Sequence, residues 1–182
     1  MAVADGPGKG RLARATLDTP LGRVVVAARN EVVVLLDFAE QEARWGPALA
    51  RRFPDAVVVE AADPAGAVTA LRAYLAGDLD ALDGLAVDPG GTPFQRAVWL
   101  ALRTIRPGTT IAYAELARRV GSPHAFRAVG ITNGRNPISI VLPCHRVIGA
   151  DGTLTGYGGG LWRKQWLLRH EGVAVQGELL SG

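Results

Sequence analysis

Hydrophobic residues in the first half of the chain form short runs separated by turns. Residues 13–39 contain β-branched runs interrupted by TPLG and RNE, turn signals that predict an antiparallel meander of strands. Residues 40–53 have helical spacing, and the apolar run at 57–61 predicts another strand. Residues 65–77 predict a second helix, which ends at Gly77. The apolar face of that helix carries Val68, Leu71, Tyr74 and Leu75.

The second half begins with a clear helix start. Thr92 is a suitable N-cap, Pro93 suits the first helical position, and Gln95 lies three residues after the cap. Pro107-Gly108 ends this helix. Its apolar stripe consists of Phe94, Ala97, Val98, Ala101, Leu102 and Ile105.

Two shorter helices follow and are joined by a tight turn. The first carries Tyr113, Leu116 and Val120 on one face and ends at Gly121. Ser122-Pro123 predict the start of the second, which runs to about Asn133. Short helices joined by a glycine-containing turn are typical of a helix-turn-helix, although other helical hairpins have the same pattern.

The composition changes between the two halves. Residues 77–91 are rich in Gly, Asp and Pro and predict a linker. We therefore expect a two-domain α/β (α+β) fold. An N-terminal antiparallel-sheet α/β domain would span 11–88, and a winged-helix-like helix-turn-helix domain would span 89–172. Residues 1–10 predict a disordered lead-in, and residues 173–182 predict a tail.

Composition excludes several classes of protein. A chain of 182 residues that is 48% hydrophobic can bury a core. Its one cysteine cannot form an intramolecular disulfide, which favours a reducing, cytoplasmic location. The sequence has neither a run of about 18 apolar residues for a membrane span nor a signal peptide, so we expect no membrane association. One cysteine and three histidines argue against a zinc site, and we expect no metal and no cofactor.

Charge is distributed unevenly along the chain. Residues 1–90 have a balance of −4 and residues 91–182 a balance of +7, which together give the net charge of +3. A basic second half favours contact with a polyanion such as nucleic acid, with a solvated basic face as the alternative. Combined with the helix-turn-helix pattern, the charge favours DNA binding.

The second helix of this pair has an unusual surface for DNA recognition. Its sequence, PHAFRAVGITN, is rich in small and apolar residues, and Arg127 is its one charged residue. A helix that reads bases in the major groove would normally carry several polar side chains. The composition instead fits close approach to the minor groove, with Arg127 entering the base stack. An ordinary surface salt bridge is the alternative role for Arg127.

The single cysteine lies in the segment VLPCHRVIG. The preceding run, which starts at Asn136, predicts a β-like segment that ends at Pro143 and leaves Cys144 facing a cleft. A thiol needs a base or a positive environment to become a nucleophile. In a strand His145 would face away from Cys144, so a bridging water is the expected link.

A carboxylate downstream could complete this site. Glu171 lies at the negative end of a helix over 161–172, where an acidic residue is locally unfavourable. A partner such as His145 would explain its position and would give a Glu–His–water–Cys relay. The alternative is a surface Glu171 and a buried, inert Cys144.

Successive motifs resemble one known family. FQRAVWLALRTI, GTTIAYAELARRVG, RAVGITNGRNPISIVLPCHRVIG and GTLTGYGGGLWRKQWLLRHEG are similar to those of the O6-alkylguanine-DNA alkyltransferases. The resemblance spans 94–172 and is weaker in the first half, through TPLG and VVVLLDF. It implies irreversible, single-turnover transfer of an alkyl group from O6 of guanine, with O4 of thymine as a further candidate, to Cys144.

The resemblance also implies roles for individual residues. His145 and Glu171 would ionise Cys144 through a water, Tyr113 would donate a proton to the guanine, and Asn136 would hold the turn before the cysteine. Arg127 would fill the gap left by a flipped nucleotide. The implied DNA contacts are Ser122, Ala125, Phe126, Arg127 and Arg135. The implied base pocket consists of Pro143, Val147, Tyr157 and Gly158.

The expected partner is double-stranded DNA that contains O6-alkylguanine, and we expect a monomer with no obligate protein partner. A binding-only relative and a cysteine hydrolase are the alternatives; the first typically lacks the acceptor cysteine. The chain departs from the family pattern at four positions, and the absence of a serine at Ala112 removes an N-cap that contributes roughly 1 kcal/mol. These positions are Arg106, Ala112, Ile131 and Thr132.

Overall fold

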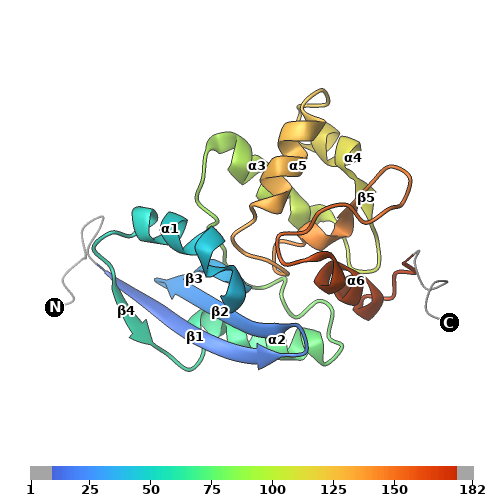
Figure 1. The fold of residues 1–182 in the computed structure, drawn as a ribbon. Helices are drawn as coiled ribbons and strands as arrows, with labels where there is room; N and C mark the ends of the chain where they lie inside the picture. The colour runs from blue at the N-terminus through green and yellow to red at the C-terminus, as the bar shows by residue number, and fades with distance from the viewer. Residues whose placement is uncertain (1–9, 176–182) are drawn as a thin grey trace.

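A computed structural model describes residues 10–175 and begins with a four-stranded sheet in the order β3-β2-β1-β4 (Figure 1). β1 (Arg11–Thr19), β2 (Gly22–Arg29) and β3 (Val32–Phe38) pair antiparallel, which confirms the meander. β4 (Val57–Glu60) pairs parallel with β1. A parallel neighbour requires a crossover, and α1 (Glu42–Arg52) supplies it.

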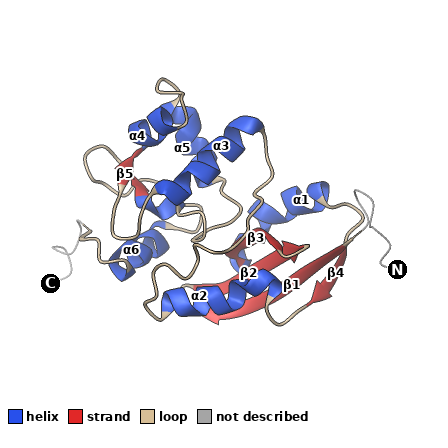
Figure 2. Ribbon diagram, turned by 180° about the vertical axis from the view of Figure 1, so that it is seen from behind, coloured by secondary structure: helices blue, strands red, loops and turns tan. Residues whose placement is uncertain are grey.

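Helices cover both faces of this sheet (Figure 2). Alternate residues of a strand point to opposite faces, so Val24 and Val26 pack on the side of α2 (Ala67–Leu75), whereas Val25 packs with Trp45 of α1. The face of α2 predicted from helical spacing is the face that is buried.

The second half is mainly helical. α3 (Pro93–Ala101) begins with the capping box expected at Thr92 and continues into a 3-10 turn, Leu102–Thr104. α4 (Tyr113–Arg119) and α5 (Phe126–Gly134) form the helix-turn-helix, and α6 (Leu161–His170) follows. A short parallel pair of strands, β5 (Ile111–Ala112) and β6 (Val147–Ile148), connects the segment before α4 with the segment after Cys144.

The second helix of the helix-turn-helix begins later than Ser122-Pro123, where the sequence predicted its start. Ser122 N–H donates to the Ala117 carbonyl at 2.9 Å, and the Ser122 carbonyl accepts from Ala125 N–H at 2.9 Å. These bonds form a tight turn, so α5 begins only at Phe126.

The β-like segment expected before Cys144 is also wrong. The segment closes on itself, because Leu142 N–H donates to Ile138 O and Cys144 N–H donates to Leu142 O. Cys144–Arg146 is a 3-10 turn, and a strand begins only at Val147. Side chains in a 3-10 turn do not alternate between two faces, so alternation does not separate His145 from Cys144.

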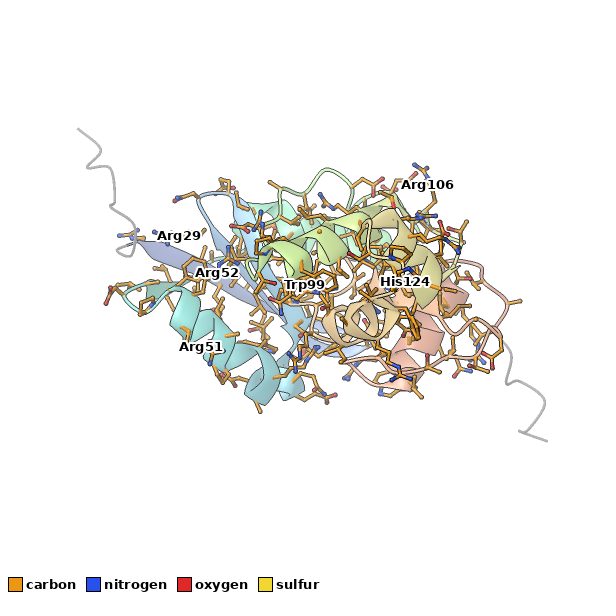
Figure 3. The ribbon with its side chains drawn as sticks, turned by 90° about the horizontal axis from the view of Figure 1, so that it is seen from above. Arg29, Arg51, Arg52, Trp99, Arg106 and His124 are labelled. Atoms are coloured by element: carbon orange, nitrogen blue, oxygen red, sulfur yellow. The ribbon has the colours of Figure 1, made fainter. Side chains whose placement is uncertain are left out.

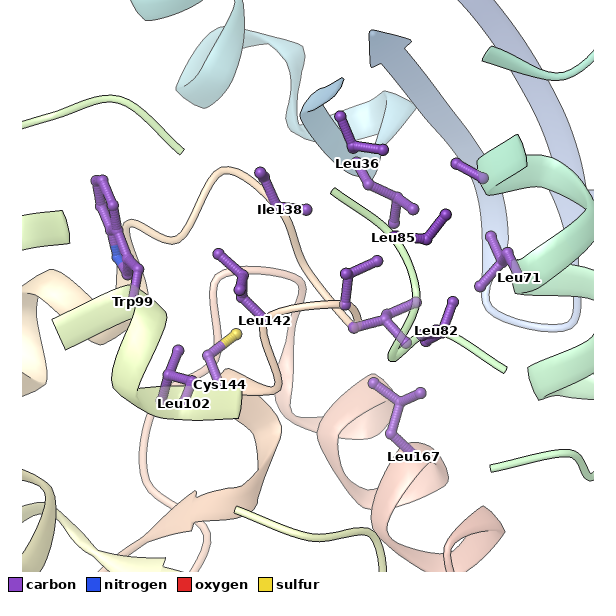
Figure 4. Packing of buried hydrophobic residues seen from close by; sticks show 14 of the residues in the cluster. Leu36, Leu71, Leu82, Leu85, Trp99, Leu102, Ile138, Leu142, Cys144 and Leu167 are labelled. Carbon is purple, nitrogen blue, oxygen red and sulfur yellow. The ribbon is translucent and has the colours of Figure 1, made fainter. Parts of the chain in front are cut away.

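The predicted linker packs against the sheet. Val33 N–H donates to Ala86 O and Asp88 N–H donates to Val33 O, both at 2.9 Å. Leu82 and Leu85 are buried in a hydrophobic cluster that extends from the sheet to Cys144 (Figure 4). The two halves therefore share one core, and the domain boundary near residue 88 stays a prediction.

The ends of the chain leave two predictions open. The lead-in at 1–10 and the tail at 173–182 lie largely outside the described residues. Within residues 10–175 no helix is both long enough and apolar enough to span a membrane.

Candidate active site

Cys144 lies at the start of the 3-10 turn and is 4% exposed. Leu102 and Leu142 pack near it (Figure 4). Burial raises the pKa of Cys144, and the Asn136 amide and the nearby Lys164 charge oppose this only in part. The resting side chain is therefore a thiol, and reaction requires a group that removes its proton.

Two asparagines fix the backbone around the cysteine. Asn136 Nδ2 donates to Leu142 O at 2.7 Å, and Asn136 Oδ1 accepts from Ile138 N–H at 3.0 Å. Asn133 Nδ2 donates to Cys144 O at 3.3 Å. Asn136 thus holds the closed turn that replaces the expected strand.

Glu171 and His145, the two candidates for the relay, are in direct contact. The distance between His145 Nε2 and Glu171 Oε1 is 2.8 Å, and both side chains are buried. Glu171 is the C-cap of α6, and Gly172 has a φ of 83°, the left-handed conformation that glycine adopts readily. The alternative of a surface Glu171 is wrong.

Other donors complete the shell of Glu171. Arg146 Nη2 donates to Oε1 at 2.8 Å and Arg146 Nε to Oε2 at 3.0 Å. The Tyr74 hydroxyl of α2 donates to Oε1 at 2.7 Å. Burial acts to raise the pKa of Glu171, but the hydrogen bonds from His145 and Arg146 and the Arg146 charge outweigh burial, so the pKa stays well below its usual range.

His145 is arranged as a neutral base. Burial lowers the pKa of His145, despite the hydrogen bond from its ring to Glu171. Because Nε2 faces the carboxylate, the neutral ring donates from Nε2 and leaves Nδ1 as an acceptor. Among residues 10–175, Nδ1 is buried and has no hydrogen-bond partner.

Tyr113 is the first residue of α4 and lies near Lys164 of α6. Its hydroxyl donates to Thr155 O at 2.8 Å, and the Lys164 Nζ lies 5.9 Å from its ring centroid. A Cβ at Gly130 of α5 would lie 3.6 Å from the Tyr113 ring, so the two helices pack closely there. Burial raises the pKa of Tyr113.

The predicted DNA contacts fall in two places. Ser122 and Ala125 lie in the turn between α4 and α5, and Phe126 and Arg127 are exposed on the first turn of α5. Arg127 lies over the Phe126 ring, with 6.0 Å to the centroid. Arg135 is exposed at the other end of α5, apart from these four.

The predicted pocket residues come from the cysteine turn and from the loop before α6. Pro143 and Val147 are buried beside Cys144 in the chain, and the Tyr157 hydroxyl is buried with no hydrogen-bond partner within residues 10–175. A Cβ at Gly158 would lie 2.1 Å from Arg44 Nη1 and 2.9 Å from the backbone Gly134 O, so a side chain here would force both Arg44 and the end of α5 to shift.

A cavity of about 660 Å³ lies between α1 and α3; Asp37, Arg44 and Asn136 are among the residues that line it, and Cys144 is not. Figure 3 shows Trp99, one of its lining residues, between Arg51 and Arg52 on one side and His124 on the other.

Lys164 was missed by the sequence analysis. It is fully buried on α6, and its Nζ donates to Val147 O at 2.6 Å and to two more carbonyls, Thr155 O and Gly156 O, at 3.3 Å. Burial lowers its pKa to about 8, and its charge favours the Cys144 thiolate. Helical spacing could have found it, because Lys164 shares a face with Leu167, Leu168 and Glu171.

The fold and the site together define a class: a DNA-binding helix-turn-helix protein that carries one buried cysteine with a histidine–carboxylate pair behind it. Residues 93–173 match the family model described as "6-O-methylguanine DNA methyltransferase, DNA binding domain". The chain belongs to the family of methylated-DNA–protein-cysteine methyltransferases, as a relative that matches it over most of both lengths shows and as this match supports.

The relatives cover most of the chain. The methylated-DNA–protein-cysteine methyltransferase of Mycolicibacterium paratuberculosis is 48% identical over 86% of this chain and 90% of its own length. The Shigella flexneri protein of the same name is 58% identical over 64% of this chain and 68% of its own. These matches confirm the resemblance seen in the sequence.

Solved structures support the same assignment. The Mycobacterium tuberculosis O6-methylguanine methyltransferase has a TM-score of 0.73 and 41% identity, over 94% of this chain and 99% of its own. The M. tuberculosis protein in complex with DNA has a TM-score of 0.74 and 42% identity, over 90% of this chain and 96% of its own. The expected two-domain α/β fold is confirmed.

Proposed function

We propose that Cys144 accepts the alkyl group in the direct-reversal DNA repair reaction of this family. The supporting observation is the count of cysteines. A protein-cysteine methyltransferase needs a cysteine of its own, and this chain of 182 residues has one. Its position beside a neutral histidine gives the thiol a base.

Proton transfer precedes or accompanies the attack. The proton of Cys144 passes through a water to His145 Nδ1, which is the ring nitrogen without a protein partner among residues 10–175. His145 Nε2–H already donates to Glu171, whose negative charge stabilises the imidazolium that forms. Lys164 adds positive charge near the thiolate.

The transfer itself breaks one bond and makes one. The sulfur attacks the alkyl carbon, the bond from that carbon to guanine O6 breaks, and its electron pair stays on the base. Tyr113 supplies a proton or hydrogen bond to the base as this charge develops. The product is a thioether, which has no activated carbonyl for water to attack, so each molecule reacts once.

The DNA substrate is a duplex that contains O6-alkylguanine. O6 lies inside the stacked pair, so the nucleotide must leave the helix to reach a buried sulfur. Arg127 and Phe126 are exposed at the start of α5, where Arg127 can fill the gap in the stack. The sugar–phosphate backbone of the DNA is contacted by Ser122, Ala125 and Arg135. The protein acts as a monomer.

The extruded base is held in a pocket formed by Pro143, Val147, Tyr157 and Gly158. Asn136 keeps the cysteine turn closed behind it. The absence of space for a side chain at Gly158 supports close packing of this wall.

Mass spectrometry tests the proposal directly. The protein is mixed with a duplex that contains O6-methylguanine and is then digested and mapped. One methyl group per protein on Cys144 is expected, and Cys144→Ser should bind the duplex without transfer. An unmodified Cys144 with an intact lesion contradicts the proposal, and repeated turnover would indicate a hydrolase instead.

The role of Arg127 needs a separate comparison. Arg127→Ala should slow repair of the duplex while leaving the reaction with free O6-methylguanine base within about twofold. Equal loss on both substrates contradicts a role in base extrusion.

A further inference from the structure

β3 ends in a buried carboxylate that reaches the segment before Cys144. Asp37 is 1% exposed, and its Oδ1 accepts from the Ser139 hydroxyl at 3.1 Å and from Phe38 N–H at 2.9 Å. Arg44 of α1 forms an ion pair with the other oxygen, Oδ2. Asp37 and Ser139 are 102 residues apart in the sequence, so this contact joins the two halves.

The backbone makes the same connection. Leu36 N–H donates to Pro137 O at 3.1 Å, and Ser139 N–H donates to Leu36 O at 2.7 Å. Leu36 and Ile138 form a parallel bridge. The segment before Cys144 is therefore attached to β3 as a short extension of the N-terminal sheet.

Arg44 extends this connection to the end of α5 and to the loop that contains Tyr157 and Gly158. Its Nη1 donates to Gly134 O at the end of α5, at 2.9 Å. The same nitrogen lies against Gly158 in the loop before α6, and Gly158 itself lies next to Gly134. The carboxylate of Asp37 thus orients both Ser139 and an arginine that touches α5 and the 157–160 loop.

We infer that Asp37 is a positioning residue for alkyl transfer. It fixes the Asn136–Ser139 turn and, through Arg44, the distance between α5 and the loop that contains Tyr157 and Gly158. This inference rests on the proposed function. The N-terminal half therefore sets the geometry in which Cys144 meets the base, and it does more than support the fold.

Several charged or titratable groups face Asp37. Arg44 comes from α1, Arg163 from α6, and Cys144 and Tyr157 from the pocket. Burial raises the pKa of Asp37 to about 6, although Arg44 and the bonds from Phe38 and Ser139 act to lower it. Asp37 is ionised at neutral pH and becomes protonated below pH 6, where it loses acceptor capacity.

The test compares Asp37→Asn with a matched control, Asp88→Asn. Asp88 also joins the halves through two arginines, Arg52 of α1 and Arg96 of α3, but it does not touch the pocket. Full-length wild-type and variant proteins are assayed for duplex affinity, for the single-turnover rate at saturating DNA, and for reaction with free O6-methylguanine base.

Asp37→Asn should reduce the transfer rate at least tenfold on both the duplex and the free base, with the duplex Kd within about twofold of wild type. Asp88→Asn should transfer at the wild-type rate even if its melting temperature falls. Wild type should also slow below pH 6 by a factor that Asp37→Asn lacks. A merely structural Asp37 would lower the melting temperature and leave the rate and its pH profile unchanged, which would overturn the inference.

Misfolding of Asp37→Asn and failure of the proposed function can each be recognised. If Asp37→Asn does not fold, Ser139→Ala removes only the hydroxyl contact and should slow transfer about threefold on both substrates; an unchanged rate overturns the inference. If wild type itself leaves Cys144 unmodified, the proposed function fails and the inference fails with it, whereas a wild-type rate for Asp37→Asn overturns the inference alone.

Discussion

Two buried carboxylates, Glu171 and Asp37, lie near the Cys144 turn. Both accept several hydrogen bonds, but their pKa values are shifted in opposite directions. Glu171 accepts from Tyr74, His145 and Arg146, and its pKa stays well below the usual range. Asp37 accepts from Ser139, Phe38 N–H and Arg44, yet its pKa rises to about 6. Each joins a residue of the first half to one of the second.

The difference lies in the donors, because His145 and Arg146 together outweigh the effect of burial on the pKa of Glu171. Arg146 is 8% exposed and bonds both oxygens of Glu171, so its charge acts at close range away from water. Arg44 is 26% exposed and bonds one oxygen of Asp37, and burial outweighs its attraction. Glu171 is thus fixed as an anion, whereas Asp37 can be protonated in mildly acidic solution.

Glu171→Gln should have the largest effect on both stability and transfer. It leaves the buried Arg146 guanidinium without a counter-charge, which should lower the free energy of unfolding by about 3–5 kcal/mol. It also removes the group that stabilises a protonated His145, so transfer should fall by about 100-fold. Urea unfolding at pH 7 and single-turnover transfer measure the two effects.

A double variant provides the control for this result. Glu171→Gln combined with Arg146→Met removes both charges and should recover much of the stability without recovering transfer. Recovery of transfer together with stability would show that Glu171 acts on the fold alone.

The stability contributed by Asp37 should depend on pH in the opposite direction to that contributed by Glu171. The pKa of Asp37 is about 6 in the folded protein, above its ordinary value of 3.8, so folding is favoured while the group is protonated. This contribution is full below about pH 4 and is lost as pH rises to about 6, a change of about 3 kcal/mol. The stability difference between wild type and Asp37→Asn, measured by urea unfolding from pH 4 to 7, should fall by this amount.

Glu171→Gln is the matched comparison here. Because folding lowers the pKa of Glu171, its contribution is present above the unfolded pKa and is lost as pH falls. The wild-type advantage over Glu171→Gln should therefore shrink toward acid, whereas the advantage over Asp37→Asn should grow. Parallel curves for the two variants would refute the contrast.

The two carboxylates also mark how far the sequence could predict this site. The position of Glu171 at a helix end, before Gly172, was enough to suggest His145 as its partner, and the two are 2.8 Å apart. Asp37 gave no such signal, because it lies inside a strand and its partner Ser139 is 102 residues away. Periodicity predicts which face of an element is buried, as for Tyr74, but not what that face contacts.

The same limit explains the error before Cys144. An apolar run of this length predicts a strand if only local preference is considered. The hydrogen bonds of Asn136 instead close the segment into turns, and its remaining backbone groups pair with β3. Side-chain bonds of this kind override β preference and are visible only in the folded protein.

Tyr74→Phe should have a smaller effect on the Glu171 side. It removes one hydrogen bond to the carboxylate, at 2.7 Å, and keeps the ring that packs on His170 at 5.1 Å. A hydrogen bond to a charged group contributes about 2 kcal/mol, and the unfolding free energy should fall by that amount. Because Arg146 and His145 still hold Glu171, transfer should fall only about threefold; a loss as large as that of Glu171→Gln would mean that Tyr74 acts in the reaction.

Ala112→Ser should give the smallest change, and it separates stability from positioning. Ala112 is the N-cap of α4 and has no side chain that can accept a hydrogen bond, whereas Thr92 caps α3 with a capping box. A serine at this position can accept from Glu115 N–H at the third helical residue, which should stabilise the protein by about 1 kcal/mol. Thermal unfolding measures the gain, and Thr92→Ala, with a loss of similar size, is the reverse control.

Transfer should stay within about twofold in both variants, because neither touches the two carboxylates. If transfer followed stability in this pair, the losses expected for Asp37→Asn and Glu171→Gln would reflect weaker folding and not the geometry around Cys144.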